Sequence, residues 1–177
     1  MHRERGFTLL ELLTVVAIAG ILITVAIPDF SAMLRRNRAV TAVNSLAHAL
    51  IFARYSAITR DRYVTLCRST DGKHCSTDTD WEDGWLIFVN LDRDYPAHVD
   101  SGEPVLHVHG PLAAGARVLS NRTAFTFRPR GIRSTNGTLL YCSAEDQFDR
   151  ALVISVTGRL RLADAADLSN GMTCADP

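Results

Sequence analysis

Residues 7–28 read Phe-Thr-Leu-Leu-Glu-Leu-Leu-Thr-Val-Val-Ala-Ile-Ala-Gly-Ile-Leu-Ile-Thr-Val-Ala-Ile-Pro, an apolar run in which Glu11 carries the single charge. As an α-helix this run would extend about 33 Å, which matches the hydrocarbon core of a bilayer. It is longer than the apolar region of a usual secretory signal peptide, and no Ala-x-Ala-like cleavage site follows it. The run therefore predicts a membrane-spanning helix, and we expect no cleavage after it.

The charge of Glu11 is the unusual feature of this run, because an ionised side chain in an apolar membrane segment costs about 3 kcal/mol or more. Glu11 ends the hexapeptide Gly-Phe-Thr-Leu-Leu-Glu, residues 6–11, which follows the basic residues Arg3 and Arg5. A short basic leader, a glycine and then Phe-Thr-Leu-x-Glu form the signature of the type IV pilins and pseudopilins. The chain resembles that family at each of these positions.

The pilin resemblance implies how the N-terminus is processed and used. A prepilin peptidase would cut between Gly6 and Phe7, and Phe7 would become the N-methylated first residue of the mature chain. Glu11 would then neutralise the new N-terminal amine of a neighbouring subunit, which replaces a lone charge in lipid by an ion pair. The expected partners are therefore the peptidase, other pilin or pseudopilin subunits and the inner membrane.

Length and charge bound the rest of the chain. A length of 177 residues suits one globular domain in addition to an anchor. The formal net charge is zero, but the charges are segregated along the sequence. Residues 30–70 hold seven Arg and one Asp, residues 71–103 hold nine acids against one Lys and one Arg, and residues 117–162 hold eight Arg against three acids. A basic surface for an anionic partner requires that the acidic segment faces away from it.

The cysteines are even in number, lack Cys-x-x-Cys spacing and all follow the apolar run, as expected for disulfides in an oxidising compartment. Arginines flank the run on both sides, so the positive-inside rule does not choose an orientation. The cysteines therefore favour a periplasmic C-terminal part. Of the three possible pairings, we expect Cys67–Cys75, which closes a short turn at Asp71-Gly72, and Cys142–Cys174, which tethers the polar C-terminal tail.

Beyond Pro28 the apolar residues fall on one side of a helix, which predicts an amphipathic continuation of the same helix. The whole helix should then run from about Phe7 to about Thr59. Because proline lacks an N–H donor, a kink or local melting is expected at Pro28. The apolar positions at spacings of three and four are Phe30, Met33 or Leu34, Val40, Val43, Leu46 or Ala47, Leu50, Ala53 or Arg54, and Ala57 or Ile58.

The later sequence reads as short strands separated by turns, with candidates at 63–67, 84–89, 104–108, 117–119, 124–127, 138–142, 151–156 and 159–162. Together these patterns divide the chain into five segments. We expect a leader at 1–6, a transmembrane or fibre-core half-helix at 7–29, an amphipathic half-helix at 30–61, a β-rich head at 62–163 and, at 164–177, a polar tail tethered by Cys174.

Three motifs occur in order along the head. They are Trp81-x-x-Gly84-Trp85-Leu86-Ile87-Phe88-Val89 followed by a loop with Asp92 and Asp94, then Phe127-x-Pro129-x-Gly131, and Val153-Ile154-Ser155-Val156-Thr157-Gly158-Arg159. In this order the motifs resemble the minor pseudopilin subgroup called GspH/FimT, and the similarity covers nearly the whole chain. The fold that this resemblance implies is α+β: a pilin-like long N-terminal helix packed on a head of two small antiparallel β-sheets.

The last motif continues as Gly158-Arg159-Leu160-Arg161, which resembles the Gly-Arg-x-Arg motif of the FimT-type minor pilins that capture DNA for natural transformation. Residues two apart in a strand share a face, so Arg159 and Arg161 would point together. Leu160 and Leu162 would turn to the core. Two guanidinium groups on one face can bind successive phosphates, and such contacts carry no base information. The alternative is a solvated strand edge without a ligand.

Further arginines could enlarge this basic patch. Arg128, Arg130 and Arg133 would join it if their loop lies beside the terminal hairpin, and Arg117 and Arg122 are weaker candidates. The ligand expected from these residues is the phosphate backbone of double-stranded DNA, bound without sequence preference and with strong dependence on salt.

The leading hypothesis is thus a minor type IV pilin that displays a sequence-independent DNA-binding surface for DNA uptake. Two alternatives remain: a GspH-like minor pseudopilin at the tip of a type II secretion pseudopilus, and a pilus-priming minor pilin without DNA binding. All three imply a single-pass inner-membrane protein with a periplasmic head, assembled into a pilus or pseudopilus at the cell surface. No nucleophile, base and oxyanion set and no metal-ligand spacing stands out in the sequence, so we expect no enzyme, metal or cofactor.

Overall fold

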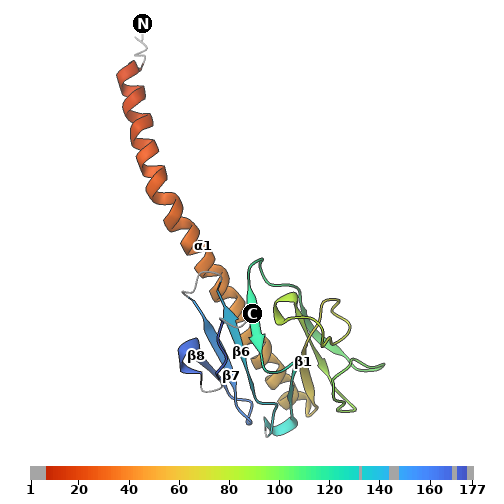
Figure 1. Cartoon of the computed structure of the whole chain (residues 1–177). Coiled ribbons are helices and arrows are strands. Elements are labelled where there is room, and N and C mark those ends of the chain that lie inside the picture. The colour runs from red at the N-terminus through yellow and green to blue at the C-terminus, as the bar shows by residue number, and fades with distance from the viewer. Residues whose placement is uncertain (1–6, 132, 144–147, 169–170, 175–177) are drawn as a thin grey trace. The chain divides into compact units, whose positions relative to one another are not determined.

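The computed structural model describes residues 7–131, 133–143, 148–168 and 171–174, and for residues 23–29 it describes the backbone alone. The chain separates into two compact units, Met1–Arg38 and Ala39–Pro177. Figure 1 traces the helix and the strands along the chain. The predicted leader, with Gly6, lies outside the described residues.

The first unit holds the N-terminal part of helix α1, which runs from Leu9 to Arg60. The helix begins after Thr8, whose Oγ1 accepts a hydrogen bond from the backbone N–H of Glu11 at 3.2 Å, as a capping residue does. The large apolar side chains at positions 9–22 are exposed. A kink or local melting was expected at Pro28; helix α1 continues through this residue, so the melting is wrong. Proline removes one N–H donor, and the hydrogen bonds on either side keep the helix intact.

The apolar run was predicted to cross a membrane. Among the described residues, no helix has a stretch that is both long and apolar enough to do so. The predicted span at 7–29 includes residues 23–29, whose side chains lie outside the description.

The head begins with residues 39–60 of α1, which bury one face. Val43, Leu46 and Leu50 are at most 5 % exposed, as their spacing predicts. Val40 was expected on this face, but it is 36 % exposed, and Ala39 takes its place at 2 %. Both positions lie about one turn before Val43, and spacing alone could not choose between them.

Eight strands follow in the described part of the head, and they form two antiparallel sheets of four strands each (Figure 1). Sheet A has the order β3-β2-β1-β5, with β1 at Val64–Arg68, β2 at Trp85–Val89, β3 at Val105–His109 and β5 at Ala124–Phe127. Sheet B has the order β4-β6-β7-β8, with β4 at Arg117–Ser120, β6 at Gly137–Cys142, β7 at Arg150–Ile154 and β8 at Leu160–Asp164. The expected α+β fold, a long helix with two small antiparallel sheets, is confirmed.

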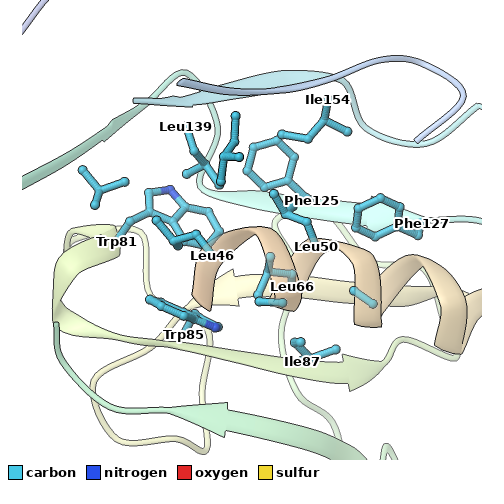
Figure 2. Packing of buried hydrophobic residues seen from close by; sticks show 14 of the residues in the cluster. Leu46, Leu50, Leu66, Trp81, Trp85, Ile87, Phe125, Phe127, Leu139 and Ile154 are labelled. Carbon is cyan, nitrogen blue, oxygen red and sulfur yellow. The ribbon is translucent and has the colours of Figure 1, made fainter. Parts of the chain in front are cut away.

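One hydrophobic core joins the helix to both sheets. Leu46 and Leu50 of α1 belong to the same buried cluster as Leu66 of sheet A and Leu139 and Ile154 of sheet B, and each of these side chains is at most 2 % exposed. Figure 2 shows them between the helix and the two sheets. Because each such side chain contributes about 1.5–3 kcal/mol when buried, this cluster holds the two sheets on the helix.

The opposite face of each sheet carries a smaller cluster that includes a disulfide. The two bonds are Cys67–Cys75 and Cys142–Cys174, the expected pairing, with Cα atoms 5.5 Å apart in each. Leu168 and Met172 of the C-terminal tail pack against the cluster that contains Cys142. The second disulfide therefore fastens the tail over the outer face of sheet B.

A short 3-10 helix, η1 at Trp81–Asp83, connects the loop before β2 to sheet B. The Oε2 atom of Glu82 accepts a hydrogen bond from Val118 N at 3.0 Å, and the carbonyl of Glu82 accepts one from Leu112 N at 2.8 Å. Burial raises the pKa of the Glu82 carboxyl above its ordinary value, with smaller contributions from the negative charges of Asp80 and Asp83.

Replacing Glu82 by glutamine should raise the free energy of unfolding at neutral pH by less than about 1 kcal/mol, because the amide keeps an oxygen for Val118 N–H and removes a partly buried charge. Folding raises the pKa of Glu82, so the stability of the wild type falls relative to the variant as pH rises through the folded pKa. Chemical unfolding of the detergent-solubilised chain at about pH 4 and about pH 7.5 measures this difference. A Glu82→Gln gain that is larger at the acidic pH would contradict the argument.

Candidate nucleic-acid interface

The Gly-Arg-x-Arg residues lie where β7 turns into β8. Gly158 N donates a hydrogen bond to Ser155 O at 2.8 Å, and Ser155 N donates one to Arg159 O at 3.0 Å, which closes a three-residue turn. Gly158 has a φ of 71°, and a Cβ atom on it would lie 2.9 Å from the Oγ of Ser134. The positive φ therefore favours glycine at this position, and an added Cβ would also displace the Ser134 hydroxyl.

Arg159 and Arg161 are exposed at the end of sheet B, where β8 is the edge strand. The ladder includes Arg159 through its carbonyl, so the two residues follow the two-residue period of a strand and share a face. The expectation that Leu160 and Leu162 both turn to the core is half wrong. Leu160 packs against the core, but Leu162 is 57 % exposed, because the core cluster ends at Leu160 and does not reach along the edge strand.

The loop that carries Arg128, Arg130 and Arg133 lies beside this turn, which is the condition set for a larger basic patch. Ser134 N donates to the carbonyl of Val156 in the turn at 2.7 Å, and the next residue of the loop is hydrogen-bonded to β5. The loop therefore joins the end of sheet A to the β7–β8 turn. All three of its arginines are exposed.

A polar cavity of about 480 Å³, which we call the Tyr63 pocket, lies along the same loop. It is lined by Tyr63, Asn90, Arg93, Asp94, Tyr95, Thr126, Arg128, Arg133, Ser134 and Thr135. The Cζ atom of Arg93 lies 4.6 Å from the centroid of the Tyr63 ring, and that of Arg128 lies 5.8 Å from it. Both distances fall within the range of cation–π contacts. The pocket therefore gathers three arginines from two loops, and two of them lie near one aromatic ring.

Sequence reasoning missed Arg93 and Tyr63 as members of this surface. Arg93 lies in the acidic segment 71–103, and its charge was counted with its neighbours in sequence rather than with Arg128. The available signal was a single arginine within an otherwise acidic loop. That signal is weak, because only the fold brings the loop to the ring of Tyr63.

Other arginines of the head have structural partners. Arg150 forms an ion pair with Asp164 across the β7–β8 hairpin at 2.7 Å, and Arg122, one of the weaker candidates, donates its Nε–H to Asn136 O at 3.0 Å. In contrast, the exposed arginines of the β7–β8 turn, of its neighbouring loop and of the Tyr63 pocket form no ion pair with any carboxylate among the described residues: Arg93, Arg128, Arg130, Arg133, Arg159 and Arg161. Arg60 and Arg62 are also exposed without a carboxylate partner in the described part of the chain, so these six are distinguished by their place on the turn and the loops around it.

The acidic segment does not lie wholly apart from these arginines. Asp94 lines the Tyr63 pocket, where its Oδ1 accepts from Asn90 Nδ2 at 2.8 Å and its Oδ2 accepts from His98 N at 2.7 Å. Asp92, Asp94 and Asp100 also bring oxygen atoms close enough together to hold a metal ion. Two of these three residues are exposed, and exposed carboxylate groups of this kind are common without a metal.

The head has the fold of the type IV minor pilins. Two crystal structures of the type IV minor pilin FimU from Pseudomonas aeruginosa resemble the chain with TM-scores of 0.56 and 0.52. The alignments cover 75 % and 72 % of this chain and 92 % and 94 % of FimU, at 23 % and 22 % identity, so they support the fold alone.

The sequence comparisons define the family. The family model described as type II transport protein GspH matches residues 42–158, and the model of the prokaryotic N-terminal methylation motif matches residues 1–27. The chain therefore belongs to the GspH family of pilin-like proteins. This family is structural rather than enzymatic, so the chain is not an enzyme. Its methylation motif implies processing by a prepilin peptidase and assembly into a pilus.

Curated relatives agree with this assignment. The pilin-like protein PilA1 of Thermus thermophilus is 35 % identical over 171 residues, which cover 90 % of this chain and 98 % of PilA1. A fimbrial protein of Pseudomonas aeruginosa is 48 % identical over 52 residues, which cover 28 % of this chain and 34 % of that protein. The chain is thus similar to PilA1 over almost the whole length of both proteins.

Proposed function

We propose that this chain is a FimT-type minor type IV pilin whose head binds double-stranded DNA without sequence preference and serves DNA uptake in natural transformation. The observation that carries the proposal is the group of exposed arginines around the β7–β8 turn, which have no carboxylate partner among the described residues. Like charges held close together on one surface repel one another unless an anionic partner offsets them. A polyanion is therefore the ligand that this surface favours.

Arg159 and Arg161 are suited to phosphate groups by both spacing and chemistry. Two residues apart on one strand face, their Cα atoms are about 6.8 Å apart, so each guanidinium can contact a different phosphate. The planar guanidinium donates two parallel hydrogen bonds to a phosphate. A surface that contacts only phosphates accepts any sequence, as a receptor for incoming DNA must.

The N-terminal residues explain how this surface would be displayed. In the proposal, cleavage between Gly6 and Phe7 frees the amine of Phe7, and Glu11 neutralises that amine on a neighbouring subunit. Before assembly the chain would be held in the inner membrane with its head in the periplasm, where the two disulfides can form. Assembly would then carry the head to the cell surface.

The test measures binding of the detergent-solubilised chain to unrelated duplex sequences by fluorescence anisotropy at about 50 and about 200 mM salt. We expect similar affinities for all sequences and a steep loss of affinity at the higher salt. The double variant Arg159→Gln/Arg161→Gln should bind more weakly and lower the slope of log affinity against log salt by about two, because each lost phosphate contact lowers that slope by about one.

The matched control removes the same two charges elsewhere, with Arg36→Gln in the first unit and Lys73→Gln in the acidic segment. Both of these side chains are exposed, and neither lies in the arginine group described above. The control should keep the wild-type affinity and slope. If wild type shows no salt-sensitive binding, or if the double variant and the control behave alike, the assignment of DNA binding to Arg159 and Arg161 is wrong.

One observation favours a second function: the matching family model is described as a type II transport protein. In this reading the chain is a GspH-like minor pseudopilin of a type II secretion system. Deletion of the gene would then abolish secretion of folded exoproteins and leave transformation intact, whereas the proposed function predicts the reverse. A pilus-priming role without DNA binding predicts loss of pili and wild-type behaviour of the Arg159→Gln/Arg161→Gln variant in transformation.

A further inference from the structure

We infer that the Tyr63 pocket binds one nucleotide of an unpaired DNA strand, with its phosphate against the arginines and its base against Tyr95. This inference rests on the proposed function, since it extends the DNA-binding surface from the β7–β8 turn into the pocket. The ligand differs from that of the proposed function: the pocket would bind an unpaired nucleotide, whereas Arg159 and Arg161 would bind the phosphates of a duplex.

Contacts within the pocket orient its arginine side chains so that they can bind a phosphate. Arg93 and Arg128 rest near the ring of Tyr63, and such stacking orients a planar guanidinium while its N–H edges stay free to donate. Arg133 lines the same cavity. None of the three pairs with a carboxylate within the described part of the chain. Three cations around one concave space form a stronger phosphate site than the same charges on a flat surface.

Backbone strain supports a binding role for two of these residues. Arg93 has a φ of 66° and Arg133 a φ of 57°, and both values lie in the left-handed region that side chains other than glycine seldom adopt. Such a conformation costs about 1–2 kcal/mol. Glycine would remove this cost at either position. Arginine at these positions therefore lowers stability, which is the expected sign for a side chain that serves a ligand.

The size of the pocket favours a single nucleotide over a duplex. A cavity of about 480 Å³ lies within the range of small-ligand sites, whereas a double helix can contact only its rim. Tyr95 lines the cavity and is 88 % exposed, so its ring is open to solvent. An exposed aromatic ring beside cations is the arrangement by which proteins bind unpaired nucleotides, because every base can stack on it.

The polar groups of the wall favour a nucleotide over a simple anion. Asp94 adds a negative charge that opposes a ligand made of phosphate alone. A nucleotide has an anionic phosphate and a neutral base with N–H donors, so it suits a wall with cations and a carboxylate.

The experiment compares three labelled probes bound to the detergent-solubilised full chain: a blunt duplex, the same duplex with an overhang of about ten nucleotides, and the overhang sequence as a free single strand. Wild type should bind the overhang duplex about fivefold or more tightly than the blunt duplex. Tyr95→Ala should abolish this preference and leave blunt-duplex binding unchanged. Arg159→Gln/Arg161→Gln should weaken binding of both duplexes.

Arg93→Gly separates a ligand role from a structural one. It removes the guanidinium and relieves the positive φ, so we expect an equal or higher midpoint of thermal unfolding together with about fivefold weaker binding of the overhang duplex. Lys73→Gln is the matched control for loss of one charge, and it should leave the preference for the overhang intact.

The outcomes distinguish the two proposals. An overhang preference that is absent in wild type, or that survives both Tyr95→Ala and Arg93→Gly, overturns the pocket inference while the duplex result still stands for the proposed function. Absence of salt-sensitive duplex binding overturns the proposed function. Competition for the single strand by inorganic phosphate as effectively as by a nucleoside monophosphate would show that the base makes no contact, and it would also overturn the inference.

Discussion

Replacement of Trp81 by alanine should lower the free energy of unfolding by about 3–5 kcal/mol, the range measured for deletion of a large aromatic side chain from a core. Trp81 is 1 % exposed, and its ring centroid lies 5.6 Å from that of Phe125 in β5. Its Nε1–H donates to Arg122 O at 3.0 Å. The variant loses the packing, leaves a cavity and removes the donor from that carbonyl. Chemical unfolding followed by far-ultraviolet circular dichroism measures the change.

Trp81→Phe is the matched control for this substitution. Phenylalanine keeps most of the buried ring and loses the N–H donor, so the expected cost is about 1–3 kcal/mol. If Trp81→Phe and Trp81→Ala destabilise equally, packing is not the main contribution of the side chain. If neither variant is destabilised, Trp81 does not hold η1 against the core.

Replacement of Gly84 by alanine should cost about 3 kcal/mol or more. Gly84 has φ 124° and ψ 173°, a conformation that is essentially restricted to glycine. A Cβ atom there would lie 2.7 Å from His109 O and 2.9 Å from Ser69 O, and both atoms belong to the backbone. Because neither carbonyl can rotate away, the ends of β1, β2 and β3 would have to separate. For a domain of this size the midpoint of thermal unfolding should fall by about 10 °C or more.

Gly102→Ala separates the two causes of this effect. Gly102 also has a positive φ, of 95°, but no atom lies within 4 Å of the position of an added Cβ. Alanine at this position should therefore cost about 1–2 kcal/mol, which is the conformational part alone. Equal losses for Gly84→Ala and Gly102→Ala would mean that the contacts with the two carbonyls have no effect.

These two residues show what the Trp-x-x-Gly-Trp motif does in this fold. Trp81 fills the core and Gly84 allows three strand ends to meet, so both residues serve the fold. The sequence showed that the motif was present, and it predicted a strand directly after it, which is β2. It could not show that the glycine faces two carbonyls, because Ser69 follows β1 and His109 ends β3, and both are distant from Gly84 in the sequence.

The architecture was predictable because it depends on local patterns. Each of the eight strands overlaps a predicted one, since alternation of side chains and the turn residues between strands act over a few positions. The disulfide pairing was expected from one short turn and one terminal tail. Local patterns could not predict which side chains are buried where burial depends on contacts with other elements. The spacing of apolar residues fits Val40 and Ala39 equally well on the buried face of the helix, but only Ala39 is buried. Leu162 was expected in the core, but the core cluster ends at Leu160.

The candidate interface was predictable in part. Arg159 and Arg161 are exposed, Gly158 is buried in the turn before them, and the loop of Arg128 and Arg133 lies beside that turn. The role of Arg122 was not predictable, because its partner, Asn136 O, belongs to another loop. Arg93 was also missed, because its charge was counted together with the acidic residues of segment 71–103.

The opening run of the chain and its Gly-Phe-Thr-Leu-x-Glu residues are enough to assign the pilin class, because the methylation motif is a continuous stretch of sequence. The sequence by itself also determined the helix and the strands, which depend on residues near one another in the chain, and a short turn and a terminal tail predicted the pairing of the cysteines. Only the tertiary structure decided which arginines are free and which of them meet. Arg93 and Arg128 come together over Tyr63 because β1 pairs with both β2 and β5, and that long-range pairing brings the loops after β2 and β5 to the same end of sheet A.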